Sequence, residues 1–472
     1  MVINKKTEGY IRIGVGIIAI AFLAFNILLI FNNSFWCDEI ASIVMAKMPL
    51  KEMIIKTSQD VHPPLYYAIL RICCLIFGFN GPVYHMVSIL GYMGILVVSL
   101  TLIWDNAGYI SSIVLIALSS LLYSAVHFNV EVRMYSWAAF FILLSFMFYK
   151  KILQGNGSNR KDYLLFALFS ILAAYTHYFC IITVGIFYVS IMIIGIKKKG
   201  NYLKNSILTW IITVIVYLPW AISFLINYSG NTDKIYSARY NSIWPCILYI
   251  FSSKFSILLL AVFVLLFFGI CIKKHKDDDF IWICTGILSV LTTILVPYII
   301  SMIMSPIMEE RHVYPSFVII WLLMGYCISK LKHKYVYLAI VLILVVPFGI
   351  SGLKYSFEEE KAQDEALNRF LEETSFLADS NTSIISDEWQ VAIPLMDYYY
   401  GRQADYVQNE EEMYKLIADE KESYLLVTKT EKDDIENGLK KLGYLYEPVV
   451  KDGFLGSLRL DVYRCTEASG DV

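Results

Sequence analysis

The chain has 472 residues, of which 57% are hydrophobic and only 17% are charged, and its mean hydropathy is +0.58. This composition excludes a soluble enzyme and is typical of a polytopic membrane protein, so we expect membrane lipids and no nucleic acid among its partners. The net charge of −2 conceals an uneven distribution. Residues 1–353 carry 26 Lys and Arg against 14 Asp and Glu, whereas residues 354–472 carry 13 against 27. We therefore predict a membrane domain over residues 1–353 and an acidic soluble domain over residues 354–472.

Eleven apolar segments approach the length of about 20 residues that a helix needs to cross a bilayer. The first lacks a small-residue cleavage site and is predicted to remain as a spanning helix. A further segment, 64–78, is shorter, follows Pro63 and carries Arg71, so we expect it to lie along the membrane interface as an amphipathic helix. The predicted spans are residues 11–31, 83–104, 108–126, 135–149, 162–179, 180–196, 206–226, 255–272, 280–303, 314–329 and 335–353.

The distribution of lysine and arginine predicts the orientation of these spans. When residues 64–78 do not cross, 17 of the 26 basic residues of the membrane domain fall in short loops on one side. By the positive-inside rule these loops, and the N-terminus with them, are expected to be cytoplasmic. The candidate polar side chains and the C-terminal domain are then extracytoplasmic, in an integral protein of the plasma membrane. The basic loops lie at residues 5–12, 150–161, 197–204, 273–276 and 330–334.

Beyond residue 356, short apolar segments alternate with helical patterns, which is typical of a small α/β domain. No glycine-rich phosphate loop, Walker motif or zinc-ligand spacing occurs in this part of the sequence. We therefore expect it to serve as a scaffold or to handle the acceptor rather than to form a second active site. Strands are predicted at residues 383–386, 404–407, 424–428, 444–450 and 457–464, and helices at residues 388–400, 410–420 and 431–442.

Acidic residues gather in the segment that follows the first predicted span. Asp38 and Glu39 begin this loop, and Asp60 lies shortly before His62. A carboxylate held at the membrane surface can accept the proton of an attacking hydroxyl or amine, which is general-base catalysis, and a second carboxylate can help to hold a cation. The alternative is structural, because Asp and Glu are favoured near helix N-termini and would then cap a short interfacial helix. The residues alone leave both interpretations open.

Basic side chains recur at the predicted outer ends of later spans. Arg133 and Arg311 each precede or begin a span, and a guanidinium group suits a lipid phosphate because it is always charged and bidentate. Anchoring to headgroups, or pairing with Glu131 or Glu309, would explain either arginine equally well. His177 lies between two aromatic spans, where a lone histidine is more often structural than a ligand.

Five motifs, taken together and in this order, resemble those of the GT-C membrane glycosyltransferases. The resemblance is closest to bacterial relatives of the protein O-mannosyltransferases and of the lipid A aminoarabinose transferases, in glycosyltransferase family 39. It covers about residues 10–330, and the first two motifs are its specific part. The motifs are Phe-Trp-Cys-Asp-Glu (35–39), Asp-Val-His-Pro-Pro-Leu-Tyr-Tyr (60–67), Glu-Val-Arg-Met-Tyr (131–135), Tyr-Thr-His-Tyr-Phe (175–179) and Glu-Arg-His-Val-Tyr-Pro-Ser (310–316).

This resemblance implies the fold class and the chemistry. The fold would be an all-α polytopic GT-C domain with interfacial helices in its first outer loop, followed by the small extracytoplasmic α/β domain. The family transfers a sugar from a polyprenyl- or dolichyl-phosphate donor, with inversion, on the extracytoplasmic or lumenal side. A hexose or pentose would pass to a protein, a glycolipid or a cell-envelope polymer. No cofactor is implied with certainty, and a divalent cation is left open, with Asp38 and Asp60 as its ligands if one binds.

The family's functional residues carry over to positions in this chain that match its motifs. His62 stands where protein mannosyltransferases also have His and aminoarabinose transferases have Lys, which disfavours an aminoarabinose enzyme. The family more often shows Arg-Tyr where this chain has Arg311 and His312, which weakens the match there. The expected catalytic residues are Asp38, Glu39 and Asp60, and the expected donor-phosphate or substrate-binding residues are His62, Arg133, Tyr135, His177 and Arg311.

Two rival functions belong to other classes. A lipid or sugar transporter usually shows internal repeats and interrupted helices around a midplane site. This sequence has no visible repeat, and its polar residues are predicted at one surface. A non-catalytic cell-envelope assembly protein would have no use for the coincident acidic motifs of the first loop. We therefore expect a glycosyltransferase.

Overall fold

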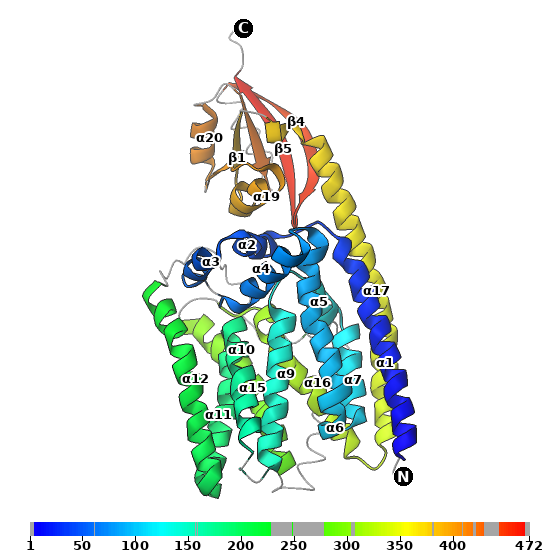
Figure 1. Ribbon diagram of the computed structural model, residues 1–472. Coiled ribbons are helices and arrows are strands. Elements are labelled where there is room, and N and C mark those ends of the chain that lie inside the picture. Colours follow the sequence, from blue (N-terminus) through cyan, green and yellow to red (C-terminus); the bar gives the residue numbers. More distant parts are fainter. Residues whose placement is uncertain are drawn as a thin grey trace. The chain divides into compact units, whose positions relative to one another are not determined.

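The structure, a computed structural model, divides the chain into two compact units (Figure 1). The first comprises Met1–Ile30 and Met45–Ser356, and the second comprises Phe31–Val44 and Phe357–Val472. The short segment Phe31–Val44, which follows the first predicted span, thus groups by its contacts with the C-terminal residues. The structure describes residues 4–60, 62–155, 157, 159–227, 248, 278–303, 307–379, 382–407, 409–418, 422–428 and 443–467.

The first unit is built from mostly apolar helices. Ten of the eleven predicted spans coincide with helices, and the other, 255–272, lies outside the described residues. Among the described residues, eight helices are long and apolar enough to cross a membrane, or nine if one bent pair counts as a single span. The remaining predicted span is α10, a helix of 17 residues. The helices are α1 (Lys5–Leu28), α2 (Cys37–Lys47, shared with the second unit), α3 (Leu50–Thr57), α4 (Leu65–Phe77), α5 (Gly81–Val98), α6 (Trp104–Ala107), α7 (Tyr109–Leu121), α8 (Tyr123–Val130), α9 (Tyr135–Gln154), α10 (Arg160–Thr176), α11 (Phe179–Lys198), α12 (Gly200–Asn227), α15 (Asp278–Ile303), α16 (Glu310–Ser329) and α17 (Lys334–Glu373), which continues into the second unit.

The predicted span 108–126 differs from the expected straight helix. Its two parts, α7 and α8, are separate helices, and the direction of the chain bends by 73° between them. The break falls at Leu122, whose ψ angle of 134° is extended rather than helical. Beside the break, the Asn129 side-chain amide donates a hydrogen bond to the Ser119 carbonyl at 3.0 Å. A carbonyl at a break in an apolar helix has to find its donor within the protein, and Asn129 supplies one here.

The two ends of the first unit carry different side chains. Helix α9 begins just after Arg133 and runs to the neighbourhood of Lys150, about 25 Å farther along at 1.5 Å per residue. There the Lys150 ammonium lies 3.3 Å from the Asp279 carboxylate, where α15 begins, and Lys330 at the end of α16 lies 3.0 Å from the same carboxylate. Lys150 and Lys330, each from one of the lysine-rich segments, therefore lie at the end of this unit opposite to Arg133.

Small residues allow the central helices to approach closely. A Cβ atom on Gly325 of α16 would lie 2.6 Å from the Ser111 Cα atom in α7, and one on Gly91 of α5 would lie 2.8 Å from the Trp137 backbone nitrogen in α9. Such contacts are typical of helix packing in membranes, where glycine lets two backbones meet. Gly91 therefore lets α5 pack directly against the first turn of α9.

The second unit contains a small α/β domain with a five-stranded sheet of order β2-β1-β3-β5-β4. Strand β1 pairs in parallel with β2 and β3, whereas β5 pairs antiparallel with β3 and β4. Each strand falls where the sequence predicts one, and the predicted helix 431–442 lies outside the described residues. The elements are α18 (Phe376–Asp379), β1 (Ser383–Ser386), a π-helical turn (Val391–Leu395), α19 (Met396–Tyr400), β2 (Asp405–Tyr406), α20 (Glu410–Ala418), β3 (Glu422–Val427), β4 (Tyr444–Leu455) and β5 (Leu458–Glu467).

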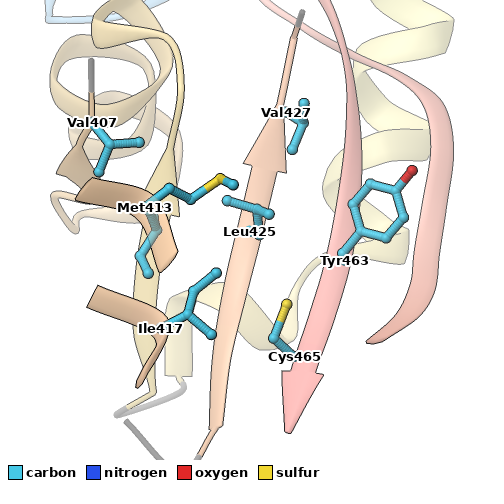
Figure 2. Close-up of a cluster of buried hydrophobic side chains, with 8 residues drawn as sticks. Val407, Met413, Ile417, Leu425, Val427, Tyr463 and Cys465 are labelled. Carbon is cyan, nitrogen blue, oxygen red and sulfur yellow. The ribbon is translucent and has the colours of Figure 1, made fainter. Parts of the chain in front are cut away.

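The core of this domain lies between α20 and the sheet (Figure 2). Met413 and Ile417 are four residues apart on α20 and so share one face of the helix, and they face Leu425 of β3. Tyr463 and Cys465 are two residues apart on β5 and share one face of the sheet. Apolar residues repeat every four positions in the helix and every two positions in the strand. These repeats are visible in the sequence, so they were sufficient to predict both elements.

Hydrogen bonds hold the segment Phe31–Val44 within the second unit. The Phe35 backbone N–H donates to the Tyr399 hydroxyl at 2.8 Å, and the Ser34 hydroxyl donates to the Gly456 carbonyl at 3.0 Å. Gly456 has a φ angle of +63°, and a Cβ atom there would lie 2.9 Å from the Phe35 carbonyl oxygen. The C-terminal residues therefore position the start of α2, which carries the predicted acidic pair.

Candidate functional site

Six of the eight predicted site residues belong to the first unit, and all six lie at or between helix ends. A side chain at a helix end can face a space that several helices share, without crossing the apolar interior. Asp60 and His62 lie between α3 and α4, Arg133 lies between α8 and α9, Tyr135 begins α9, His177 follows α10, and Arg311 lies in the first turn of α16.

Three histidines from distant parts of the sequence converge in this unit. His62, His177 and His312 are only 6%, 3% and 9% exposed. One nitrogen from each ring lies within 4.8 Å of those of the other two. The rings are inclined to one another by 47–66° rather than stacked, with centroids 5.3–6.1 Å apart. The fold thus gathers three imidazoles that more than 100 residues separate from one another in the chain.

Arg133 lies against the ring of His62. Its Nη2 atom is 3.2 Å from Nε2 and 3.4 Å from Nδ1 of that ring, and the arginine is 3% exposed. Burial, followed by the charge of Arg133, lowers the pKa of His62 well below its usual value. The His62 ring is therefore neutral at neutral pH, and the guanidinium carries the positive charge at this point.

Hydrogen bonds from three helices fix the backbone at Arg133. The Ser88 hydroxyl of α5 donates to the Arg133 carbonyl at 3.2 Å, and the Tyr66 hydroxyl of α4 lies 2.9 Å from the same Ser88 oxygen. The Ser136 hydroxyl of α9 donates to the Ser88 carbonyl at 2.7 Å. Because these side chains are buried, losing one partner would leave the others unsatisfied, so the network holds Arg133 in one place.

The two other predicted binding residues also approach this cluster. The Tyr135 ring is fully buried, with its centroid 6.0 Å from that of His177. Arg311 precedes His312, and its Nε atom forms an ion pair with the Glu309 carboxylate. The pairing with Glu309 that the sequence suggested is therefore present. A guanidinium has five N–H donors, so it can bind more than one acceptor.

His312 is the member of the cluster that sequence reasoning missed. It lies in the same motif as Arg311. The permanent charge of the arginine makes Arg311, rather than His312, the predicted phosphate-binding residue of that motif. The sequence feature that could have identified His312 is its position, since His177 and His312 both lie at the predicted outer ends of spans. Placing the histidines of the chain on the predicted topology would have put His312 on the same side as His62 and His177.

The acidic pair belongs to the second unit, at the start of α2. Glu39 is 5% exposed, and its Oε2 atom accepts a hydrogen bond from the Trp36 backbone N–H at 3.3 Å. Trp36 immediately precedes α2, so Glu39 caps this helix, as the structural interpretation predicts. Asp38 lies half-buried in the first turn, where the helix dipole stabilises negative charge. Asp60, in the first unit, is half-buried in the turn after α3.

No protein-family model and no curated protein matches this sequence. Solved structures do match. ArnT from Cupriavidus metallidurans in the apo state aligns with a TM-score of 0.62 over 97% of this chain and 98% of that chain, at 8% sequence identity. ArnT from the same organism bound to undecaprenyl phosphate aligns with a TM-score of 0.59 over 96% and 98%, at 10% identity. This chain has the GT-C fold.

The alignment to ArnT spans both units of this GT-C protein, because nearly all of each chain is covered. At such low identity the likeness concerns the fold, and it confirms the predicted fold class. Together with the apolar helices, it identifies an integral membrane protein.

Proposed function

We propose that this GT-C protein transfers a sugar from a polyprenyl-phosphate donor to an extracytoplasmic acceptor, with inversion at the anomeric carbon. The observation that carries this proposal is the group formed by buried Arg133, half-buried Arg311 and three buried imidazoles at one end of the membrane unit. A phosphate bound there would exchange its hydrating water molecules for fixed cationic hydrogen-bond donors. The attraction between these donors and the phosphate is stronger where water is excluded. ArnT, which shares the fold, has a structure with undecaprenyl phosphate bound, and this supports a lipid phosphate as the ligand here.

In the proposed reaction the two arginines act on the leaving group. The bond between the anomeric carbon and the phosphate oxygen breaks, and its electron pair stays on the polyprenyl phosphate. Negative charge on that phosphate is therefore greater in the transition state than in the bound donor. Arg133 and Arg311 would stabilise it accordingly, and interactions that strengthen in the transition state are those that raise the rate.

Asp38 is the proposed general base. As the acceptor's oxygen or nitrogen forms its bond to the anomeric carbon from the face opposite the phosphate, its proton passes to the Asp38 carboxylate. Attack from that face inverts the anomeric centre. Glu39 would act as a positioning residue, because it caps the helix that carries Asp38. Asp60 is the alternative base on the extracytoplasmic side.

We also propose the orientation that the charges predict, with the N-terminus in the cytoplasm and the C-terminal residues outside. Lys150 and Lys330 support it, because these members of two lysine-rich segments lie at the end of the first unit opposite to Arg133. The C-terminal α/β domain, residues 354–472, would then handle an acceptor such as a protein, a glycolipid or a cell-envelope polymer. Labelling single cysteines placed in the C-terminal domain from outside intact cells tests this, and a protected domain would overturn the orientation.

The transfer itself is tested in two steps. Mass spectrometry of cell-envelope glycans, with and without the protein, should reveal one sugar that depends on it. The purified chain in nanodiscs should then bind undecaprenyl phosphate and move that sugar from its polyprenyl-phosphate ester to the acceptor. Unchanged glycans together with no binding of undecaprenyl phosphate would overturn the proposal. Passage of the lipid-linked sugar across the membrane without transfer would indicate a transporter instead.

A further inference from the structure

The histidine cluster has the composition of a transition-metal site. His62, His177 and His312 are buried, and a potential ligand nitrogen of each lies within 4.8 Å of the other two. Three imidazoles suit zinc and its neighbours in the first transition series, whereas magnesium and calcium require oxygen ligands. The acidic residues that the sequence offered as cation ligands, Asp38 and Asp60, are not part of this cluster.

His312 is held as a metal-ligating histidine usually is. Its Nδ1 atom lies 3.0 Å from the Ile307 carbonyl oxygen, to which it can donate a hydrogen bond. With the proton on Nδ1, the Nε2 lone pair is free to bind a metal. A hydrogen bond from the second ring nitrogen to a carbonyl is the usual way in which a protein orients such a ligand and fixes its tautomer.

His177 supplies a second and independent sign that a ligand belongs here. Its Nε2 atom is buried and has no hydrogen-bond partner among the described residues. A buried polar atom left without a partner is costly, and native structures rarely keep one without a reason. The Phe179 backbone N–H lies 3.2 Å from Nδ1 of the same ring. Metal binding through Nε2 would place the ring proton on Nδ1 and give up this one contact.

Arg133 does not occupy the lone pair of His62. Its Nη2 atom is almost equally far from the two ring nitrogens, at 3.2 and 3.4 Å. The two lone pairs point in different directions within the ring plane, and an atom in that plane at these distances from both nitrogens would overlap the Cε1 atom between them. The Nη2 atom therefore lies out of the ring plane. The guanidinium therefore covers the His62 ring and leaves its in-plane nitrogen electrons available to a metal.

We propose that His62, His177 and His312 bind one zinc ion. Zinc takes imidazole nitrogen at about 2.0–2.1 Å and prefers tetrahedral geometry, which requires ligand atoms roughly 3.3 Å apart. The nitrogens therefore need only small rotations of their side chains from their present separations. Three neutral imidazoles leave the ion with its full charge and one open position, as in catalytic zinc sites.

The open position is expected to take an anionic oxygen. Arg133 and Arg311 both lie near the histidines and add positive charge, so the cluster with zinc would be strongly cationic. An anion at the fourth position relieves this repulsion. This step alone rests on the proposed function, in which that anion is the donor phosphate; the zinc site itself does not depend on it.

The test measures metal directly. The full chain is purified in nanodiscs without a polyhistidine tag, stripped with a chelator, and dialysed against zinc. Elemental analysis should give about one zinc ion per chain. Cobalt in place of zinc should give the visible absorption of a four-coordinate ion with nitrogen ligands. Wild-type protein that retains neither zinc nor cobalt would overturn the site, whether or not any variant folds.

Variants then assign the metal to these residues. His177→Ala and His312→Ala should weaken zinc binding by more than the about 10–100-fold that follows loss of an outer-shell partner. The matched control is His85→Ala, since His85 is 5% exposed, bonds through Nδ1 to the Val130 carbonyl and is not one of the three grouped histidines. Equal zinc loss in His85→Ala, or full retention in both cluster variants, would overturn the assignment.

The outcomes separate this site from the proposed transfer. Stoichiometric zinc in a protein that neither binds undecaprenyl phosphate nor changes envelope glycans would support the metal site and overturn the proposed function. Normal transfer by protein that takes up neither zinc nor cobalt would overturn the metal site and leave the function standing.

Discussion

Replacing Asp38 with asparagine separates its two interpretations, as a base and as part of a helix cap. Asparagine is nearly isosteric with aspartate but cannot take up the acceptor's proton. We expect Asp38→Asn to lower transfer by about 10²–10⁴, the usual contribution of general acid–base catalysis. At about 1.36 kcal/mol per tenfold change, this is about 3–5 kcal/mol of transition-state stabilisation.

The structure predicts a much smaller effect of this change on stability. Asp38 lies in the first turn of α2, where a negative charge contributes about 0.3–1 kcal/mol through the helix dipole. The cap itself is made by Glu39, whose Oε2 atom accepts from the Trp36 N–H at 3.3 Å. Asp38→Asn should therefore shift the melting temperature by less than about 4 °C, and it should leave binding of undecaprenyl phosphate unchanged.

Glu39→Gln is the matched control, because it makes the same chemical change at the next residue. The glutamine side-chain oxygen can still accept the Trp36 N–H, so the cap should survive and transfer should stay within about tenfold of wild type, less than the loss of a base would cause. Sugar transfer and thermal unfolding are measured on the same nanodisc samples. Near-normal transfer by Asp38→Asn would move the base to Asp60 or Glu39. Parallel loss of transfer and stability would favour the structural interpretation.

Two further changes test the phosphate site and the packing of the helices. Arg133→Lys keeps the charge but loses the planar fork, so undecaprenyl phosphate should bind about 10–100-fold more weakly, which corresponds to losing one charge-assisted hydrogen bond. Titration in nanodiscs measures this, and unchanged affinity in Arg133→Ala would indicate a structural arginine. Gly325→Ala should destabilise the protein by about 1–3 kcal/mol, because its Cβ atom would lie 2.6 Å from the Ser111 Cα atom. The control is Gly185→Ala in α11, where a Cβ atom meets nothing within 4 Å, and equal melting temperatures for the two variants would contradict the packing argument.

Much of the fold follows from local patterns in the sequence. Apolar runs of about 20 residues predict membrane helices because the bilayer demands them, and alternating short segments predict the sheet because side chains alternate along a strand. The span 108–126 shows where this fails. Its composition is apolar, but Leu122 is extended and the Asn129 side chain serves the Ser119 carbonyl, so the helix can break. That hydrogen bond joins residues on two helices, and the spacing of hydrophobic residues in the sequence does not predict it.

The sequence by itself determined which residue types are candidates for the site. Arg133 and Arg311 are candidates for phosphate binding because their side chains are always charged. Asp38 is a candidate base because it lies in the acidic motif of the first outer loop. Only the tertiary structure decided how they are grouped. It placed Asp38 and Glu39 with the C-terminal unit, because the chain there bonds to residues more than 350 positions away, such as Tyr399 with Phe35.

The tertiary structure also decided what the histidines are. In the sequence His177 is a lone histidine, and His312 is a neighbour of the more conspicuous Arg311. In the fold these two and His62 share one buried space, with an unpartnered Nε2 atom on His177 among the described residues. A single ring on an apolar helix end is most simply a structural residue, whereas three converging rings can form a ligand set. Convergence depends on how α4, α10 and α16 pack together, and packing is a property of the whole bundle rather than of any one segment.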